Sequence, residues 1–204
     1  MKRGAAKDLS ANHIVAAIAA AKAHKTHPER NTALIYVSVG LGLRAAEIAA
    51  LNWSYVLNGD KVGNEANLPP EAQKYGREVV TLPLEGAVRD SLQKLYAAQS
   101  AKRGVKPTDP IFVSQKGGRL TAQSLVDHFR KVWAKANAPG RSSHSGRRYF
   151  ITQVARTMSL HGGSMSDVKA LARHKHLSTT LIYIAESTEA QRAAVKNLAR
   201  GIKF

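Results

Sequence analysis

Apolar residues recur at a spacing of about 3.6 along most of this 204-residue chain, and this period constrains the fold more than any other feature. It predicts a mainly helical domain. Helices are expected at about 10–23, 32–39, 45–52, 85–99, 121–136, 145–157, 166–172, 178–185 and 189–199. Ser10 is placed to cap the first of these, and Thr188 with Gln191 to cap the last.

Residues 55–84 depart from the helical pattern. Short β-type pieces at 55–57 and 78–82 are separated by the turn-forming strings Asn58-Gly59-Asp60 and Tyr75-Gly76. These pieces predict a small antiparallel sheet. The expected fold class is therefore mainly α with a small antiparallel β-sheet, in the α+β class.

The composition removes several classes of chemistry. The chain has no cysteine, which excludes disulfides, cysteine nucleophiles and thiolate metal sites, and suits a reducing cytoplasm. The apolar stretch at 14–21 is too short to span a membrane and no cleavage pattern follows it. We therefore expect a cytoplasmic protein that does not act at a membrane.

The charge indicates a polyanionic partner. There are 31 Lys and Arg against 14 Asp and Glu, which gives a net charge of +17. Residues 1–100 hold 12 basic and 9 acidic residues, and residues 101–204 hold 19 and 5, so the two halves carry +3 and +14. Nucleic acid is the expected partner, contacted mostly by the second half.

Four separated strings carry a more specific signal. They are GLRAAEIAALNW at 42–53, SHSGRR at 143–148, LARH at 171–174 and TTLIY at 179–183. In this order they resemble the motifs G-L-R-x-x-E-[LI]-x-x-L-x-W, H-x-x-R, L-G-H and T-T-x-x-Y of the phage-integrase type of tyrosine recombinase. The nine positions from His174 to Tyr183 are also the family spacing.

The resemblance implies the catalytic domain of a tyrosine recombinase, a DNA breaking and rejoining enzyme. It implies an active site made of Arg44, His144, Arg147, His174 and Tyr183. It further implies double-stranded DNA as partner and protomers that are monomeric in solution and form a homotetramer on DNA, with room for accessory DNA-bending proteins. No cofactor and no metal is expected, since two-metal nucleases need clustered carboxylates and the acidic residues here are spread out.

The chemistry of phosphoryl transfer agrees with these residue types. Negative charge develops on the phosphate oxygens in the transition state, and fixed cationic donors stabilise it. A guanidinium group is always charged and its planar fork binds phosphate bidentately, so lysine should not replace Arg44 or Arg147. Glu47, one turn after Arg44, is expected to hold that side chain or a nearby backbone group.

Proton transfer assigns the remaining roles. A free tyrosine has a pKa of about 10 and needs a proton acceptor during attack, for which His144 is the candidate. The resemblance implies that His174 donates a hydrogen bond to a phosphate oxygen. The leaving 5′-oxygen needs a general acid, in the family a lysine of the β-hairpin. Lys74 is the predicted acid, and Lys61 in the same sheet region is the alternative.

Other residues near the motifs are not assigned to the active site. Tyr149 has the wrong spacing from His174 to be the nucleophile, and the pair His174 and His176 lacks a third ligand for zinc. Arg173 stands where the family often has glycine, and either contacts phosphate or signals an altered geometry. Further expected DNA contacts are Lys131, Lys135, Arg141, Arg148, Arg173 and Lys175, with Arg192 and Lys196 in the tail.

The expected organisation is a single catalytic domain over 1–204. Its tail, about 186–204, is expected to exchange between protomers, and no helical core-binding domain precedes residue 41, as in a minimal natural enzyme or an excised domain. Two rival functions remain on the same fold: a type IB topoisomerase-like activity and a catalytically silent DNA-binding protein. A basic RNA-binding module has no supporting motif.

Overall fold

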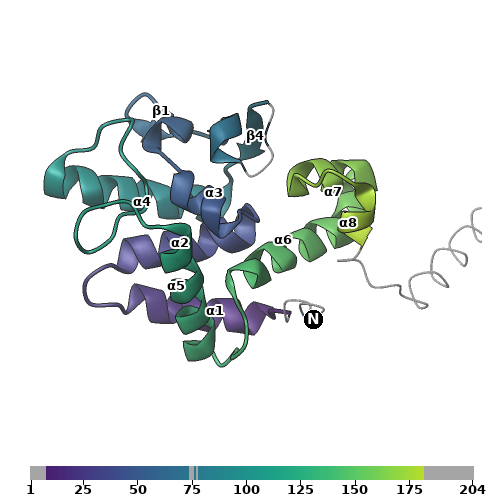
Figure 1. Ribbon diagram of the computed structural model, residues 1–204, viewed down its shortest axis with the longest axis horizontal. Coiled ribbons are helices and arrows are strands. Elements are labelled where there is room, and N and C mark those ends of the chain that lie inside the picture. The colour runs from purple at the N-terminus through teal and green to yellow at the C-terminus, as the bar shows by residue number, and fades with distance from the viewer. Residues whose placement is uncertain (1–7, 74–75, 77, 182–204) are drawn as a thin grey trace, which may run out of the picture. The chain divides into compact units, whose positions relative to one another are not determined.

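The computed structural model describes residues 8–73, 76 and 78–181 (Figure 1). The chain forms two compact units, Met1–Gln153 and Val154–Phe204, which we call unit 1 and unit 2. Unit 1 contains helices α1 (Ala11–Lys22), α2 (Pro28–Gly40), α3 (Ala45–Ala50), α4 (Gly86–Arg103), α5 (Ala122–Lys135) and most of α6 (Ser143–Thr157). The expected helix at 189–199, its cap at Thr188, and the exchanged tail lie outside the described residues.

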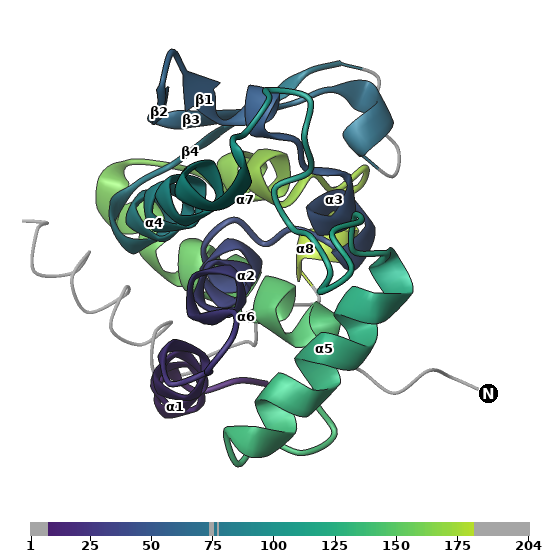
Figure 2. The same ribbon diagram turned by 90° about the vertical axis from the view of Figure 1, so that its left-hand side faces the viewer.

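Helix α2 is the centre of unit 1. It packs against both α1 and α4, and α1 and α2 are seen nearly end-on in Figure 2. Because neighbours cover α2 on more than one side, the consecutive residues 31–35 are all buried, among them Leu34 and Ile35. The helix begins four residues before the predicted start, at Pro28, whose fixed φ suits a first helical turn.

Local capping signals explain where the other helices begin. Ser10 caps α1 as predicted, in a reciprocal box with His13. Thr121 caps α5 by accepting from the backbone N–H of Ser124. Along α5, the buried residues Leu125, Phe129 and Trp133 recur every fourth position and form its core stripe.

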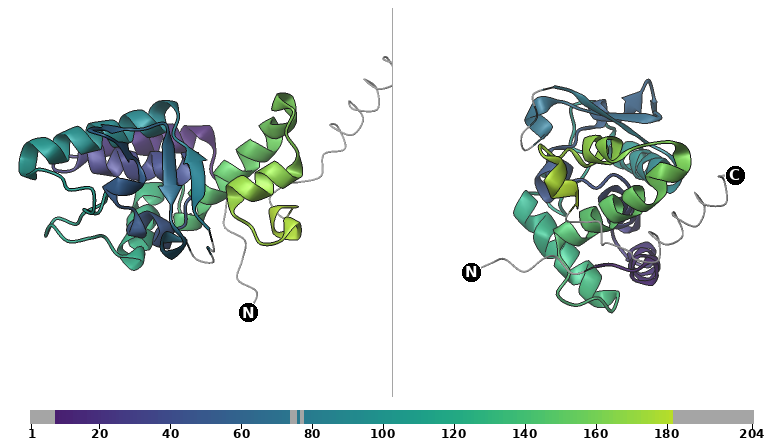
Figure 3. Two further views of the ribbon diagram at one scale, coloured as in Figure 1. Left: turned by 90° about the horizontal axis from the view of Figure 1, so that it is seen from above. Right: turned by 90° about the vertical axis from the view of Figure 1, so that its right-hand side faces the viewer.

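Two antiparallel pairs of strands complete unit 1. They are β1 (Leu57–Asn58) with β2 (Lys61–Val62), and β3 (Glu65–Leu68) with β4 (Val80–Pro83). The strands lie over the helices when the molecule is seen from above (Figure 3, left). The turn predicted at 58–60 joins β1 to β2, but the first strand starts at Leu57 because Trp53–Tyr55 form a 3₁₀ turn, and β3 was not predicted.

Unit 2 begins within α6 and continues through η3 (Met158–His161), α7 (Met165–Ala172) and α8 (Leu177–Leu181). Helix α7 packs against both η3 and α8. Ser164 and Asp167 form a capping box at its start, and the hydrogen bonds from Ser164 lower the pKa of the Asp167 carboxyl. The predicted helices at 166–172 and 178–185 correspond to α7 and to the described part of α8.

The architecture confirms the expected fold class, mainly α with small antiparallel sheets. Among the described residues, no helix combines the length and apolarity that crossing a bilayer requires.

Candidate active site

Arg44 lies where a tight turn meets a helix. Gly42 has φ of 58°, and a Cβ there would lie 2.4 Å from the ring of Phe150, so this position needs glycine for both conformation and space. Arg44 follows as the N-cap of α3. We call residues 42–44 the arginine turn.

Glu47 fixes Arg44 at two points. Its carboxylate accepts from the Arg44 backbone N–H at 2.8 Å and from the guanidinium Nη1 at 2.7 Å. The Glu47 side chain is 1% exposed, whereas that of Arg44 is 21% exposed. The buried carboxylate therefore orients a guanidinium that still reaches solvent, as the sequence predicted, and the bond to the backbone also caps α3.

Arg147 reaches the same turn from α6. Its residue is 3% exposed and its Nη1 donates to the carbonyl oxygen of Gly42 at 2.6 Å. Helix α6 can approach α2 closely because residue 146 is glycine: a Cβ there would lie 2.1 Å from Oγ of Ser38. The structure thus brings the two predicted arginines to one turn, although they are 103 positions apart in the sequence.

His144 lies in the first turn of α6, one helical turn before Arg147 and Arg148. Its residue is exposed, and its backbone N–H donates to Oγ of Ser142 at 3.3 Å. His144 is therefore accessible to solvent at the start of the helix that carries Arg147.

His174 belongs to unit 2 and follows α7. It is 8% exposed, and its Nδ1 lies 2.9 Å from the hydroxyl oxygen of Thr180, which is fully buried. This hydrogen bond helps to fix the orientation of the His174 ring. The sequence had given Thr180 no role, although it is part of the TTLIY string.

Arg173 adopts the conformation for which glycine is usual. Its φ and ψ are 53° and 45°, the left-handed region, and it ends α7 with its N–H bonded to the carbonyl of Ala170. Its Nη1 folds back onto the carbonyl of Leu171 at 3.0 Å, where a cation also complements the helix dipole. The arginine therefore ends α7 in a left-handed conformation at a cost of about 1–2 kcal/mol.

The predicted nucleophile Tyr183 and the predicted acid Lys74 lie outside the described residues. Lys74 falls in the 69–79 connection between β3 and β4, and the strand predicted after it is present as β4. The alternative, Lys61, is exposed in β2, opposite Asn58 in the other strand pair.

The predicted DNA contacts divide into two kinds. Lys131, Lys135 and Lys175 are exposed. In contrast, Arg148 forms an ion pair with the Asp8 carboxylate, and Arg141 donates to the Asp8 carbonyl at 3.1 Å. Tail residues Arg192 and Lys196 lie outside the described part. Over the described residues no three His, Asp or Glu side chains cluster as metal ligands would.

Comparison with known proteins extends this picture. The sequence matches the phage integrase family over residues 7–190. The tyrosine recombinase XerD of Pseudomonas putida is 29% identical over 186 residues, which cover 87% of this chain and 56% of the relative. The tyrosine recombinase XerC of Anoxybacillus flavithermus is 26% identical over 164 residues, covering 76% and 49%. The chain thus spans about half the length of these curated relatives.

Solved structures show the same fold. The crystal structure of XerA recombinase has a TM-score of 0.73 at 20% identity and covers 97% of this chain and 66% of that chain. The Tn1549 transposon integrase, in complex with transposon right end DNA, has a TM-score of 0.73 at 19% identity and covers 97% and 68%. A match across most of the sequence and a shared catalytic-domain fold together establish that the chain belongs to the phage integrase family of tyrosine recombinases.

Proposed function

We propose that this chain is the catalytic domain of an integrase-type site-specific recombinase, which cleaves and rejoins DNA through a 3′-phosphotyrosyl bond to Tyr183. The observation that supports this most is the arginine turn. Arg44 is held there by Glu47, and Arg147 bonds to the carbonyl of Gly42. Two guanidinium groups fixed to one stretch of backbone are suited to stabilise the charge that develops on one phosphate.

The cleavage step follows from the proposed roles. The Tyr183 oxygen attacks phosphorus while its proton passes to His144, and the bond from phosphorus to the 5′-oxygen breaks. The leaving oxygen takes a proton from Lys74, or from Lys61 as the alternative. His174, with its ring fixed by Thr180, donates to a non-bridging oxygen.

Rejoining reverses these events with a different DNA end. A 5′-hydroxyl attacks the phosphotyrosyl group and releases Tyr183, and no external energy is needed because one phosphoester replaces another. Neither step consumes a cofactor. The partners in this proposal are double-stranded DNA, with contacts from Lys131, Lys135 and Lys175, and other protomers in a tetramer on DNA within the cytoplasm.

The test is incubation of the protein with a suicide DNA substrate, nicked so that the cleaved end is lost. We expect a covalent DNA adduct that forms in EDTA and is removed by protease. Tyr183→Phe should abolish the adduct, and the matched control Tyr149→Phe should retain it. An adduct that persists in Tyr183→Phe would overturn the proposal.

The same experiment separates the rival functions. A folded wild-type protein that binds the site but gives no adduct would be a silent DNA-binding protein. An adduct accompanied by relaxation of supercoiled plasmid, with no strand exchange between two sites, would instead indicate a type IB topoisomerase-like enzyme. The proposed recombinase yields exchanged strands.

A further inference from the structure

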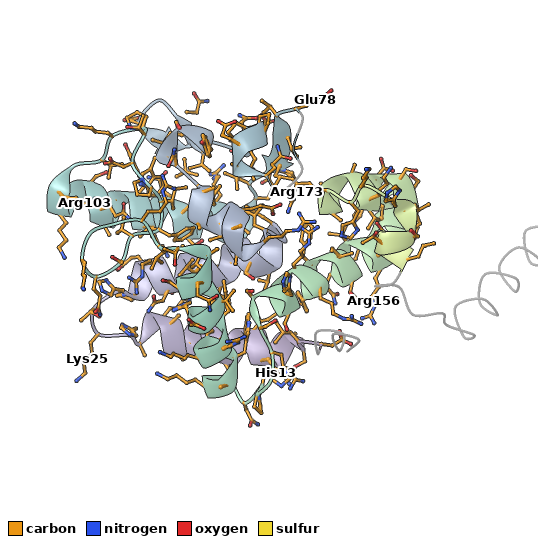
Figure 4. The ribbon with its side chains drawn as sticks, viewed as in Figure 1. His13, Lys25, Glu78, Arg103, Arg156 and Arg173 are labelled. Atoms are coloured by element: carbon orange, nitrogen blue, oxygen red, sulfur yellow. The ribbon has the colours of Figure 1, made fainter. Side chains whose placement is uncertain are left out.

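Unit 1 contains a pocket that the proposed reaction does not use. Its volume is about 370 Å³, within the range of about 300–1,000 Å³ typical of small-molecule sites. It is lined by the start of α2, the end of α4, where Figure 4 labels Arg103, and the loop at 113–117. The arginine turn follows the far end of α2, which is about 20 Å long, so the pocket is separate from the arginine turn.

The lining is strongly cationic. It includes one carboxylate, that of Glu29, and four cationic side chains, those of Arg30, Lys102, Arg103 and Lys116. The start of α2 adds the positive end of its helix dipole, and no side chain caps it, since His27 at the N-cap makes no such bond. Helix α4 contributes the negative end of its own dipole, about half a charge, which offsets that of α2 and leaves the side chains to decide the sign.

Arg30 is a partly buried cation without a carboxylate. Its guanidinium group donates to neutral oxygens: Oδ1 of Asn31 at 3.0 and 3.2 Å, and the carbonyl of Val113 at 3.0 Å. Among the described residues, no acidic group lies within ion-pair distance of it. Burial accordingly lowers the pKa of Arg30, and an anion in the pocket would stabilise its charge.

Besides the polar side chains of Thr26, Gln99, Ser114 and Gln115, the pocket has an apolar wall. Leu95 and Ala98 of α4 and Val113 of the loop line it. Orthophosphate would meet the cations and leave this wall uncovered, whereas a ligand with a flat apolar body would cover it.

We propose that the pocket at the start of α2 binds a phosphate ester of the nucleotide class, with the phosphate on Arg30, Lys102, Arg103 and Lys116 and the base against Leu95 and Val113. The inference does not rest on recombinase activity, because none of these residues belongs to the proposed active site.

Calorimetric titration of the purified chain at low salt tests the proposal, with AMP, inorganic phosphate and adenosine as probes. AMP should bind more tightly than phosphate, and adenosine should not bind. Lys102→Glu with Lys116→Glu should weaken AMP binding about tenfold or more, because two charged contacts become repulsive. The control, Lys22→Glu with Lys94→Glu, has the same net charge but alters residues outside the pocket. Its affinity for AMP should differ from that of the wild type by less than about threefold.

A second readout follows His27 by NMR. Burial, Arg30, His24 and Lys102 lower its pKa, while Glu29 raises it. A bound phosphate adds negative charge, so saturating AMP should raise the pKa of His27. Equal binding of AMP and phosphate, equal loss in both double variants, or an unchanged His27 would each overturn the nucleotide site. The DNA adduct should form equally in both double variants, so failure of the proposed function remains distinguishable.

Discussion

The two halves of the proposed site are held in different ways. At the arginine turn, a buried carboxylate, a glycine under an aromatic ring and a deeply buried Arg147 fix two guanidinium groups. At the end of α7, the His174 ring is hydrogen-bonded to Thr180, and the preceding residue occupies a conformation unfavourable for its type. Two arginines beside a tight glycine turn therefore contrast with a histidine that follows a left-handed helix end.

The two units that carry these halves also differ in the size of the side chains that they bury. Unit 1 buries large side chains completely, including Trp53, Phe112, Phe129 and Trp133. In the described part of unit 2, the buried apolar residues are Val168 and Ala172. Since buried apolar area is the main source of stability, the described part of unit 2 gains less from its core than unit 1 does.

The comparison predicts its largest effect at Arg147. Replacement by lysine keeps the charge but cannot both bond to Gly42 and present a fork to phosphate, so adduct formation should fall about 10²- to 10³-fold. Arg148→Lys, at the next position of α6, should lose less than about tenfold, because its guanidinium pairs with Asp8. Single-turnover cleavage measures both. Equal losses in the two variants would show that Arg147 has no greater role in cleavage than its neighbour Arg148.

Acid should lower the folding stability of unit 1, which carries the arginine turn. Burial, aided by Arg30, His24 and Lys131, lowers the pKa of His128 in α5 from 6.5 to about 4, and its buried Nε2 has no hydrogen-bond partner within the described chain. The unfolded state then binds the proton first, so stability is complete above pH 6.5 and declines as the pH falls toward 4. The loss should be about 3 kcal/mol.

Urea unfolding at several pH values measures this loss. His128→Gln removes the buried titrating ring and should flatten the decline between pH 6.5 and 4. His161→Gln, at an exposed position of unit 2, should leave the decline unchanged. A parallel decline in wild type and His128→Gln would contradict the assignment to His128.

Features that depend on neighbouring residues could be predicted from the sequence, whereas features that depend on contacts between distant residues could not. The helices were found because their signals are local: Ser10 caps α1, and the stripe of α5 repeats every fourth residue. Strand β3 was missed because four alternating residues acquire meaning only when paired with β4, as in Ala66 opposite Leu82. The motifs identified Arg44 and Arg147, but no sequence pattern could reveal that Arg147 bonds to the carbonyl of Gly42, two residues before Arg44.

Thr180 shows the same limit on a smaller scale. Its role depends on the chain reversing after α7, and that reversal depends on Arg173 adopting a left-handed conformation. Arginine gives no local signal for that conformation, whereas glycine would have done so. The end of α7 at residue 172 was predicted, but the left-handed conformation of Arg173 was not.

The histidine half should respond to removal of one hydroxyl. Thr180→Val preserves shape and deletes the bond to His174 Nδ1, which should cost about 1 kcal/mol of stability and reduce adduct formation about tenfold. Thr179→Val makes the same change at the neighbouring, less buried residue and should have little effect. If the two variants behave alike, the ring of His174 is held by something other than Thr180.

The smallest expected effect concerns Arg173, at the end of α7. Arg173→Gly relieves the left-handed strain, worth about 1–2 kcal/mol, but loses the bond to Leu171 and adds flexibility to the unfolded chain. We expect a net gain of about 0.5–1 kcal/mol, measured by urea unfolding or as slower amide exchange in α7. Arg156→Gly, in the last turn of α6 with no such strain, should instead destabilise. A loss of stability in Arg173→Gly would mean that the guanidinium, not the backbone, sets the balance at this helix end.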